Sequence, residues 1–360
     1  MSQETMEWLH NNVLVGFTDK RGPAWWGSRG LNSTDDSGEP NHYPLAIPLD
    51  DVLRRLPAFH TEAISVPVTV EYEDPSTGKA IRLVDSSRQV VLRPDTKNIL
   101  GIFKDGYVIH QYNEWLIGLA SKLLDTSTSD LGIANVVTLK NGAVAAVQFE
   151  LPDTIETKMG LSLRPSLLIV TSLDGSLATE PKLVMTNMVC DNTMRAGLGE
   201  NHGFGQAKVK HTLNSLGKLD ALRAKIGLEF AADELTKEFD DLIKIPVNGL
   251  QFKKFLIESR KDKEGNDPLA PDAEDGRAKT MAENRHDKLM NLWLNDERVS
   301  PWAGTAFGVL QMTNTYLQQI APANTGTIRY ERNMFNAASG KIEQSDKKTL
   351  DILEKVLANS

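Results

Sequence analysis

Hydrophobic and polar residues alternate most regularly in the middle of the chain. Two alternating runs over residues 134–151 are separated by Asn141-Gly142, a dipeptide typical of tight β-hairpins. A nearly continuous apolar run follows at residues 166–176 and predicts a buried strand. Residues 182–198 begin with extended spacing and then favour a helix. The pattern therefore predicts a β-β-β-α unit in this part of the chain.

The residues before this unit also carry strand patterns. Apolar side chains, many of them β-branched, alternate with polar ones over residues 64–72, 79–84 and 89–94. A further strand pair is expected within residues 99–111, and residues 113–124 then change to helical spacing. These patterns favour antiparallel strand pairs joined by short turns.

Apolar residues recur at helical spacing in the second half of the chain. In residues 216–244 charged side chains separate the apolar positions, as in an amphipathic helix. Further helices are expected at residues 278–296 and 303–320, and Leu353 lies on the apolar face of a last helix near the C-terminus. We therefore expect an α+β fold with mixed, mainly antiparallel sheets and a helical C-terminal part.

Local composition divides the chain into three regions. Residues 1–45 are expected to form an N-terminal arm whose loop is rich in turn-forming residues and carries two neighbouring tryptophans. Residues 46–248 are expected to form the α+β core, and residues 249–360 a mainly helical region. Within the last region, the acidic and proline-bearing residues 261–277 predict an exposed loop.

The overall composition is that of an ordinary globular protein, with 40% hydrophobic and 24% charged residues among 360. A single cysteine, Cys190, excludes an intramolecular disulfide. The first residues lack the positive charge and the long apolar run of an export signal. No stretch reaches the roughly 18 apolar residues of a membrane span. These features predict a cytoplasmic protein without membrane association.

No sequence motif for catalysis or cofactor binding is present. The chain contains neither His-Glu-x-x-His nor Gly-x-Ser-x-Gly, and the glycine-rich residues 197–205 follow a predicted helix instead of joining a strand to a helix. Cys190, Asp191 and His202 lie close in sequence without the spacing of a zinc site. We therefore expect a protein that is not an enzyme and uses no cofactor or metal.

Positive charge concentrates in the centre of a chain whose formal net charge is −8. Residues 181–225 hold seven lysines and arginines against three acidic residues, a local excess of +4. If residues 206–213 are extended, Lys208 and Lys210 point to one face and can follow a phosphate backbone. A solvated surface patch explains the same charges equally well.

A second basic group lies near the C-terminus. Arg329 and Arg332 occur there with Tyr330 and Phe335, whose rings are of the kind that stack on unpaired bases. This group is less specific than the central one, because arginines and aromatic residues also occur together on ordinary helices.

Three runs of residues resemble a known family. RPSLLIVTSLDGS at residues 164–176, VCDNTMRAGL at 189–198 and KVKHT at 208–212 resemble the central signature of the phage/plasmid-like proteins. That family has no assigned function and is carried by phages, prophages and plasmids. The predicted β-β-β-α unit beside a basic segment also resembles the single-strand annealing proteins of phage recombination, in topology alone.

These resemblances imply a leading hypothesis. The chain is expected to bind single-stranded DNA as a recombination or replication accessory of a phage or mobile element, in the cytoplasm of its host. Strand annealing is the specific activity that the resemblance suggests, and a homo-oligomer or ring is the expected assembly. The residues expected to contact nucleic acid are Arg164, Arg195, Lys208, Lys210, His211, Lys218, Arg329 and Arg332.

Two other hypotheses stay open at this point. An acidic interaction protein could present residues 229–241 and 262–275 to a host or phage partner. A metal-dependent nuclease or another enzyme could use Asp191 or His202. Recovery of a stable protein partner would favour the first, and metal-dependent turnover lost in Asp191→Asn would favour the second.

Overall fold

A computed structural model describes residues 11–21, 39–118, 131–150, 154–187, 192–194, 210–211, 228–322 and 329–359. The chain divides into two compact units, and both draw on separate stretches of sequence. The first unit comprises Met1–Pro152, Leu167–Lys182 and Gly203–Ile226, and the second comprises Asp153–Ser166, Leu183–His202 and Gly227–Ser360. The boundaries expected near residues 45 and 248 therefore differ from those of these units.

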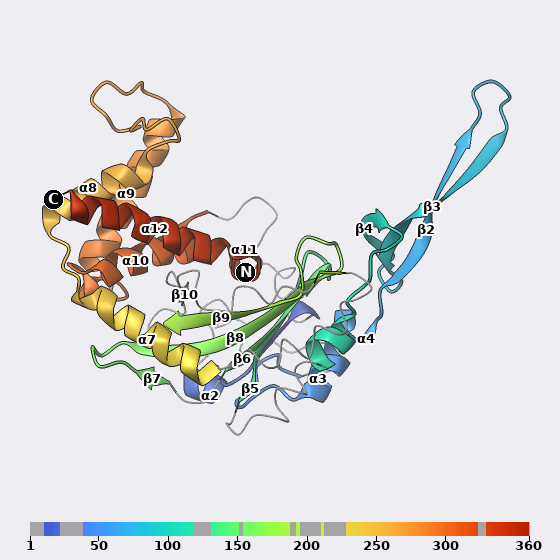
Figure 1. Ribbon diagram of the computed structural model, residues 1–360, viewed down its shortest axis with the longest axis horizontal. Coiled ribbons are helices and arrows are strands. Elements are labelled where there is room, and N and C mark those ends of the chain that lie inside the picture. Colours follow the sequence, from blue (N-terminus) through green and yellow to red (C-terminus); the bar gives the residue numbers. More distant parts are fainter. Residues whose placement is uncertain are drawn as a thin grey trace. The chain divides into compact units, whose positions relative to one another are not determined.

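A seven-stranded sheet runs through the middle of the sequence (Figure 1). Its strands follow the order β1-β5-β6-β8-β9-β10, and β7 pairs with β8 beside this path. The β1–β5, β5–β6, β7–β8 and β9–β10 pairs are antiparallel. The strands are β1 (Val13–Val15), β5 (Gly132–Leu139), β6 (Val144–Glu150), β7 (Ile155–Glu156), β8 (Ser162–Ser172), β9 (Glu180–Asn187) and β10 (Asn192–Met194).

The central hairpin predicted from Asn141-Gly142 is confirmed. Strands β5 and β6 pair in antiparallel register, with Leu139 opposite Val144. The turn between them places Lys140, Asn141 and Gly142 at positive φ angles of 50°, 55° and 83°. Asparagine and glycine tolerate this left-handed conformation better than other residues, so the dipeptide specifies the turn. The run at residues 166–176 is also a buried strand, since it forms most of β8.

The extended start predicted for residues 182–198 is confirmed, whereas the helix predicted after it is wrong for the residues that the structure describes there. Glu180–Asn187 forms strand β9, and Asn192–Met194 forms strand β10, which pairs back onto β9. The backbone of this segment bonds to neighbouring strands, and that pairing outweighs a weak local preference for a helix. The central unit is therefore a run of strands instead of β-β-β-α.

A separate three-stranded sheet lies in the first unit, in the order β2-β3-β4. Its strands are β2 (Ile64–Glu73), β3 (Ala80–Arg93) and β4 (Asn98–Lys104). In Figure 1 the β2–β3 hairpin extends as a long two-stranded ribbon. The strand pair predicted within residues 99–111 is half correct, because only β4 forms. Residues 107–111 have no strand pairing and turn towards other parts of the same unit.

The described helices of the first unit are short. They are α2 (Thr18–Arg21), α3 (Leu49–Arg55), α4 (Pro57–His60) and the π-helical turn η1 (Asn113–Ile117). The turn η1 begins where helical spacing was predicted, and its Trp115, Leu116 and Ile117 are buried. This turn carries one of the rings of the candidate site described below.

Helices form most of the second unit, as the spacing of apolar residues predicts. They are α7 (Leu228–Lys244), α8 (Gly249–Arg260), α9 (Arg277–Asn295), η4 (Ser300–Trp302), α10 (Ala306–Thr315), η5 (Tyr316–Ile320), α11 (Arg329–Ser339) and α12 (Lys341–Ala358). The buried residues of α8, α9, α10 and α12 share one core, in which the rings of Phe252 and Trp293 stack at 4.0 Å. The expected α+β class is therefore confirmed. Among the helices described here, none is long and apolar enough to cross a membrane.

Candidate functional site

Five rings form one continuous stack in the first unit. The centroids of Phe103 and Tyr107 lie 3.9 Å apart, and those of Tyr107 and His211 lie 5.0 Å apart. His211 in turn stacks on His110 at 3.9 Å, and His110 stacks on Trp115 at 3.6 Å. Neighbouring ring planes differ by 19° or less. Two segments that are distant in sequence, residues 103–115 and His211, therefore meet in one structure, which we call the ring stack.

The ring stack runs from the interior of the first unit to its surface. His110 and Trp115 are only 0% and 2% exposed, respectively. Phe103, Tyr107 and His211 are half-buried, so their edges reach solvent. The buried end fixes the orientation of the rings, and the open end is the part that a ligand can reach.

Two glycines provide the space that Phe103 occupies. A Cβ atom on Gly101 would lie 2.6 Å from Cζ of Phe103, and one on Gly175 would lie 2.7 Å from Cε1 of the same ring. Gly175 also has a φ of +68°, which disfavours other residues. The Leu-Asp-Gly-Ser turn between β8 and β9 is therefore shaped to pack against the ring stack.

Hydrogen bonds hold the two imidazoles in place. Nδ1 of His110 lies 2.6 Å from the hydroxyl of Thr179, which lies 2.7 Å from the hydroxyl of Thr171. Nδ1 of His211 donates to the carbonyl of Val108 at 3.1 Å. The Nε2 atoms of both histidines are buried and have no hydrogen-bond partner among the described residues. One nitrogen of each ring is thus anchored while the other is left in an apolar setting.

Burial keeps both histidines neutral near pH 7. Desolvation lowers the pKa of His110 to about 3, and the neighbouring His211 adds to the effect. Desolvation also lowers the pKa of His211, although the carbonyls of Val108 and Leu177 oppose that change. Burial raises the pKa of Tyr107, with a further contribution from the carboxylate of Asp174. The ring stack is therefore uncharged at neutral pH.

Two exposed lysines lie next in sequence to residues of the ring stack. Lys104 follows Phe103 directly in the sequence, and Lys210 precedes His211; both side chains are exposed. Lys140, on the central hairpin, reaches Asp174 at 3.4 Å. Two exposed lysines are thus sequence neighbours of ring-stack residues, although the side chain of Lys104 points to the face of β4 opposite Phe103, because neighbouring residues of a strand alternate. Among the described residues, no group of three or more histidines, cysteines or acidic residues is arranged to hold a metal ion.

The structure places the other residues of the predicted central interface in different ways. Arg164 is only 2% exposed, so its side chain is buried. The prediction that Arg164 contacts DNA is therefore wrong. Arg164 lies on β8, in which every residue except Ser162 is buried. His211 contributes its ring to the stack instead of pointing freely to solvent. Arg195, Lys208 and Lys218 lie outside the described residues.

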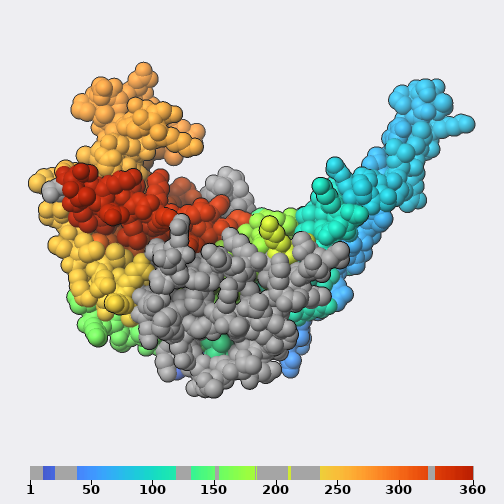
Figure 2. All heavy atoms as spheres, viewed as in Figure 1, coloured from blue at the N-terminus to red at the C-terminus, as the bar shows by residue number. Residues whose placement is uncertain are grey.

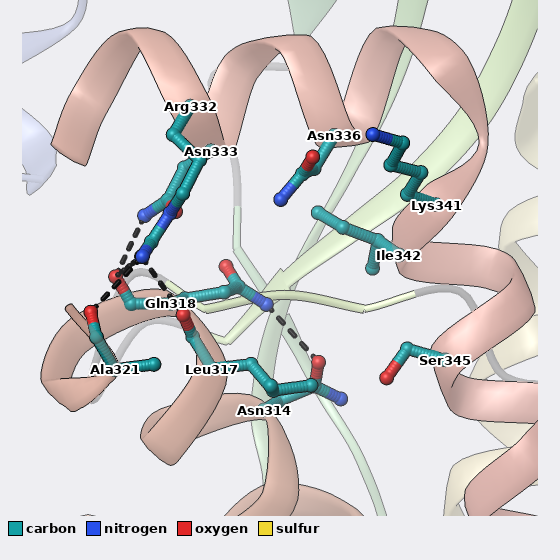
Figure 3. A pocket seen from close by; sticks show the side chains of 10 residues that line it. All are labelled: Asn314, Leu317, Gln318, Ala321, Arg332, Asn333, Asn336, Lys341, Ile342 and Ser345. Atoms are coloured by element: carbon teal, nitrogen blue, oxygen red, sulfur yellow. Dashed lines mark hydrogen bonds between the residues drawn. The ribbon is translucent and has the colours of Figure 1, made fainter. Parts of the chain in front are cut away.

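Arg332, predicted to contact nucleic acid, instead binds the end of a helix in the second unit. Its guanidinium donates to the carbonyls of Leu317 and Gln318 in η5, at 2.8 and 3.2 Å. It also donates to those of Ala321 and Pro322, at 2.9 and 3.0 Å. Several of these contacts are drawn in Figure 3. The arginine satisfies carbonyls that a helix end leaves without partners.

The neighbours of Arg332 point to the same structural role. Burial lowers the pKa of Arg332, and the positive charge of Arg329 adds to this effect. Arg329 is itself half-buried. The side chain of Tyr330 is only 5% exposed, so its ring belongs to the interior instead of a base-stacking surface. Lys341 lies over the ring of Phe335 at 5.7 Å.

A polar cavity of about 210 Å³ adjoins Arg332 (Figure 3). Asn314, at its floor, donates to the buried carboxylate of Asp346 at 2.8 Å. The amides and hydroxyl around the cavity can bind a small polar molecule. The lining residues are Asn314, Leu317, Gln318, Ala321, Arg332, Asn333, Asn336, Lys341, Ile342 and Ser345.

The sequence contains one feature that points to the ring stack, a cluster of ring-bearing residues, which neither the charge distribution nor the known motifs reveal. Phe103, Tyr107, His110 and Trp115 fall within thirteen residues, an unusual density of rings for a chain with 6% aromatic residues. Local spacing cannot show that these rings meet His211, because about a hundred residues separate the two segments. Only the fold brings them together.

Comparison with protein families gives one match. The model for a family described as Domain of unknown function (DUF932) matches residues 99–340. The match begins in β4 and includes all five residues of the ring stack. Comparison with curated proteins and with solved structures gives no match. Because the matched residues make up more than half of the chain, this protein belongs to the DUF932 family.

Proposed function

We propose that this chain binds single-stranded DNA without catalysing a reaction, as a recombination or replication accessory of a phage or other mobile element in the host cytoplasm. Strand annealing is the activity that we assign to it. The observation that carries the proposal is that two exposed lysines, Lys104 and Lys210, are each next in sequence to a residue of one ring stack. Exposed lysines supply the phosphate contacts on which sequence-independent DNA binding depends.

The ring stack acts in this proposal mainly as a rigid support. Its rings already use their faces to stack on one another, so a base can meet only their exposed edges or the open end. The stack connects the strand that ends at Lys104 to the segment that carries Lys210. Holding the two charges in fixed positions lowers the entropy lost when a flexible strand binds.

A titration of a labelled single strand tests the proposal. Fluorescence polarisation should be measured with an oligonucleotide of roughly 30 residues, long enough for a site of about 4–16 nucleotides, at several salt concentrations. The logarithm of the binding constant should fall by about 0.7 per phosphate contact for each unit in the logarithm of salt concentration. The double variant Lys104→Glu/Lys210→Glu should reduce this slope by about 1.4 if each lysine makes one contact.

A matched control separates local contacts from total charge. Lys253 and Lys288 are exposed lysines on α8 and α9, and changing both to Glu alters the net charge by the same amount. That control should bind DNA nearly as wild type does at moderate salt. Absence of wild-type binding at low salt, or equal weakening in both double variants, would overturn the proposal. Acceleration of duplex formation between complementary strands then tests annealing itself.

A further inference from the structure

The sheet β2-β3-β4 has one apolar face that is exposed to solvent. Paired residues in an antiparallel sheet share a face, and so do alternate residues of one strand. Val70 is paired with Leu83, and Val66 is paired through Val90 with Ile102. These paired residues and the alternate residues of β2 lie on one surface, which we call the apolar arm face. Its exposed members are Ile64, Val66, Val70, Tyr72, Leu83, Ile99 and Ile102, between 38% and 67% exposed.

The opposite face of the same sheet is different. Near the base of the sheet it is covered, since Val91 is 0% exposed and Phe103 belongs to the ring stack. Towards the tip it is more polar, with an ion pair between Glu71 and Arg82 at 3.6 Å. The sheet is thus amphipathic, and the face without cover holds most of its exposed apolar side chains, together with Asp85, which is paired with Val68 on the same face. In Figure 2 the β2–β3 hairpin stands clear of other atoms on the side shown.

The area of this face is large for a chain that stays alone. Seven residues, each about half exposed and each with a full accessible area of roughly 200 Å², backbone included, present about 700 Å² of mainly apolar surface. The largest apolar patch of a typical monomer is about 300–600 Å² and often functional. Two such faces in contact would bury about 1,400 Å², within the usual range for a specific protein interface of about 1,200–2,000 Å².

The net charge of the sheet β2-β3-β4, which we call the arm, indicates what kind of partner can bind its apolar face. Residues 64–104 contain six basic and five acidic side chains, a net charge of +1. This near balance favours neither a nucleic acid nor a strongly charged protein. Pro67 lies in the edge strand β2 and lacks an amide hydrogen, which disfavours extension of the sheet by another strand at that edge. Contact through the face is therefore favoured over contact through the edge.

We propose that the apolar arm face is the surface through which two copies of this chain associate. An apolar, nearly neutral sheet face is complementary to itself, and a two-fold axis places the same residues on both sides of the contact. Sheets that meet in this way pack about 10 Å apart with interdigitated side chains. The association needs no DNA, so it is separate from the function proposed above.

Sedimentation velocity of the full chain across a concentration series tests the proposal. Wild type should change from monomer to dimer as its concentration rises towards about 0.1 mM, a range that covers weak as well as tight association. Leu83→Lys should raise the dissociation constant at least about tenfold, because each dimer would bury two unpaired charges. Val70→Lys, opposite Leu83 on the same face, should have a similar effect.

Val84→Lys is the matched control. Val84 follows Leu83 on β3, is 58% exposed against 55% for Leu83, and points to the opposite face. It should associate as wild type does, and circular dichroism should show that all variants fold. A wild type that stays monomeric would overturn the proposal. In that case another part of the chain or a different protein would cover the apolar arm face. Equal dissociation in Leu83→Lys and Val84→Lys would overturn it as well.

Discussion

The buried histidine of the ring stack, His110, makes stability depend on pH in a way that can be calculated. His110 has its pKa lowered to about 3 in the folded protein, whereas an unfolded chain has the ordinary value of 6.5. Below pH 6.5 His110 becomes protonated in the unfolded state, whereas in the folded state it stays neutral until the pH approaches 3. The contribution of His110 to stability is therefore present above pH 6.5 and is lost progressively as pH falls towards 3.

The magnitude follows from the two pKa values. At pH 5 an unfolded His110 is almost fully protonated and the folded one is almost fully neutral, which costs the folded state about 2 kcal/mol relative to pH 7.5. Acidic residues also titrate between these pH values, so wild type alone cannot isolate the effect. The variant His110→Phe keeps a ring between His211 and Trp115 but removes the proton.

Urea unfolding at both pH values measures the difference. Wild type should lose about 2 kcal/mol more stability than His110→Phe between pH 7.5 and pH 5. The variant leaves Thr179 with its hydrogen bond to Thr171, so no new buried group loses every partner. If both proteins lose stability equally, His110 does not stay neutral in the fold, and the description of the stack as an uncharged support is wrong.

The remaining predictions concern single contacts. Gly175→Ala should cost roughly 1–3 kcal/mol of stability in the same urea assay, because the φ of Gly175 is +68° and the new methyl group would contact Phe103. The control Gly106→Ala should cost far less, because a Cβ atom at Gly106 has open space around it. Arg332→Gln should lose roughly 1–3 kcal/mol of stability by freeing helix-end carbonyls, with no change in affinity for single-stranded DNA by polarisation. Lys104→Glu/Lys210→Glu should flatten the salt dependence of DNA binding, and Leu83→Lys should dissociate the dimer in sedimentation.

Much of the fold could be predicted from local patterns. The hairpin around Asn141-Gly142 was predictable because a left-handed turn accepts few residue types. The helices α7, α9, α10 and α12 were predictable because their apolar residues recur at helical spacing, and buried residues of the last three meet in a common core. The strand β10 was not, since a segment that can be helix or strand follows the hydrogen-bond partners that the rest of the sheet offers.

The candidate site was less predictable, for a different reason. Positive charge, with nearby aromatic residues in the case of Arg332, led to the selection of Arg164 and Arg332, but the fold buries the first and uses the second to hold a helix end. A positive residue has the same charge in a core, at a helix end and on a binding surface, so composition cannot separate these roles. His211 was selected by its basic neighbours, whereas its position depends on the rings of another segment.

The sequence by itself determined the class of fold, the central hairpin and the exposed strands of the arm. Those features depend on contacts between residues that are near one another along the chain, and periodicity records such contacts. Tertiary structure alone decided that Phe103, Tyr107, His110, Trp115 and His211 form one stack. It also decided which arginines are buried and which face of the arm stays open, because burial is set by neighbours that are distant in sequence.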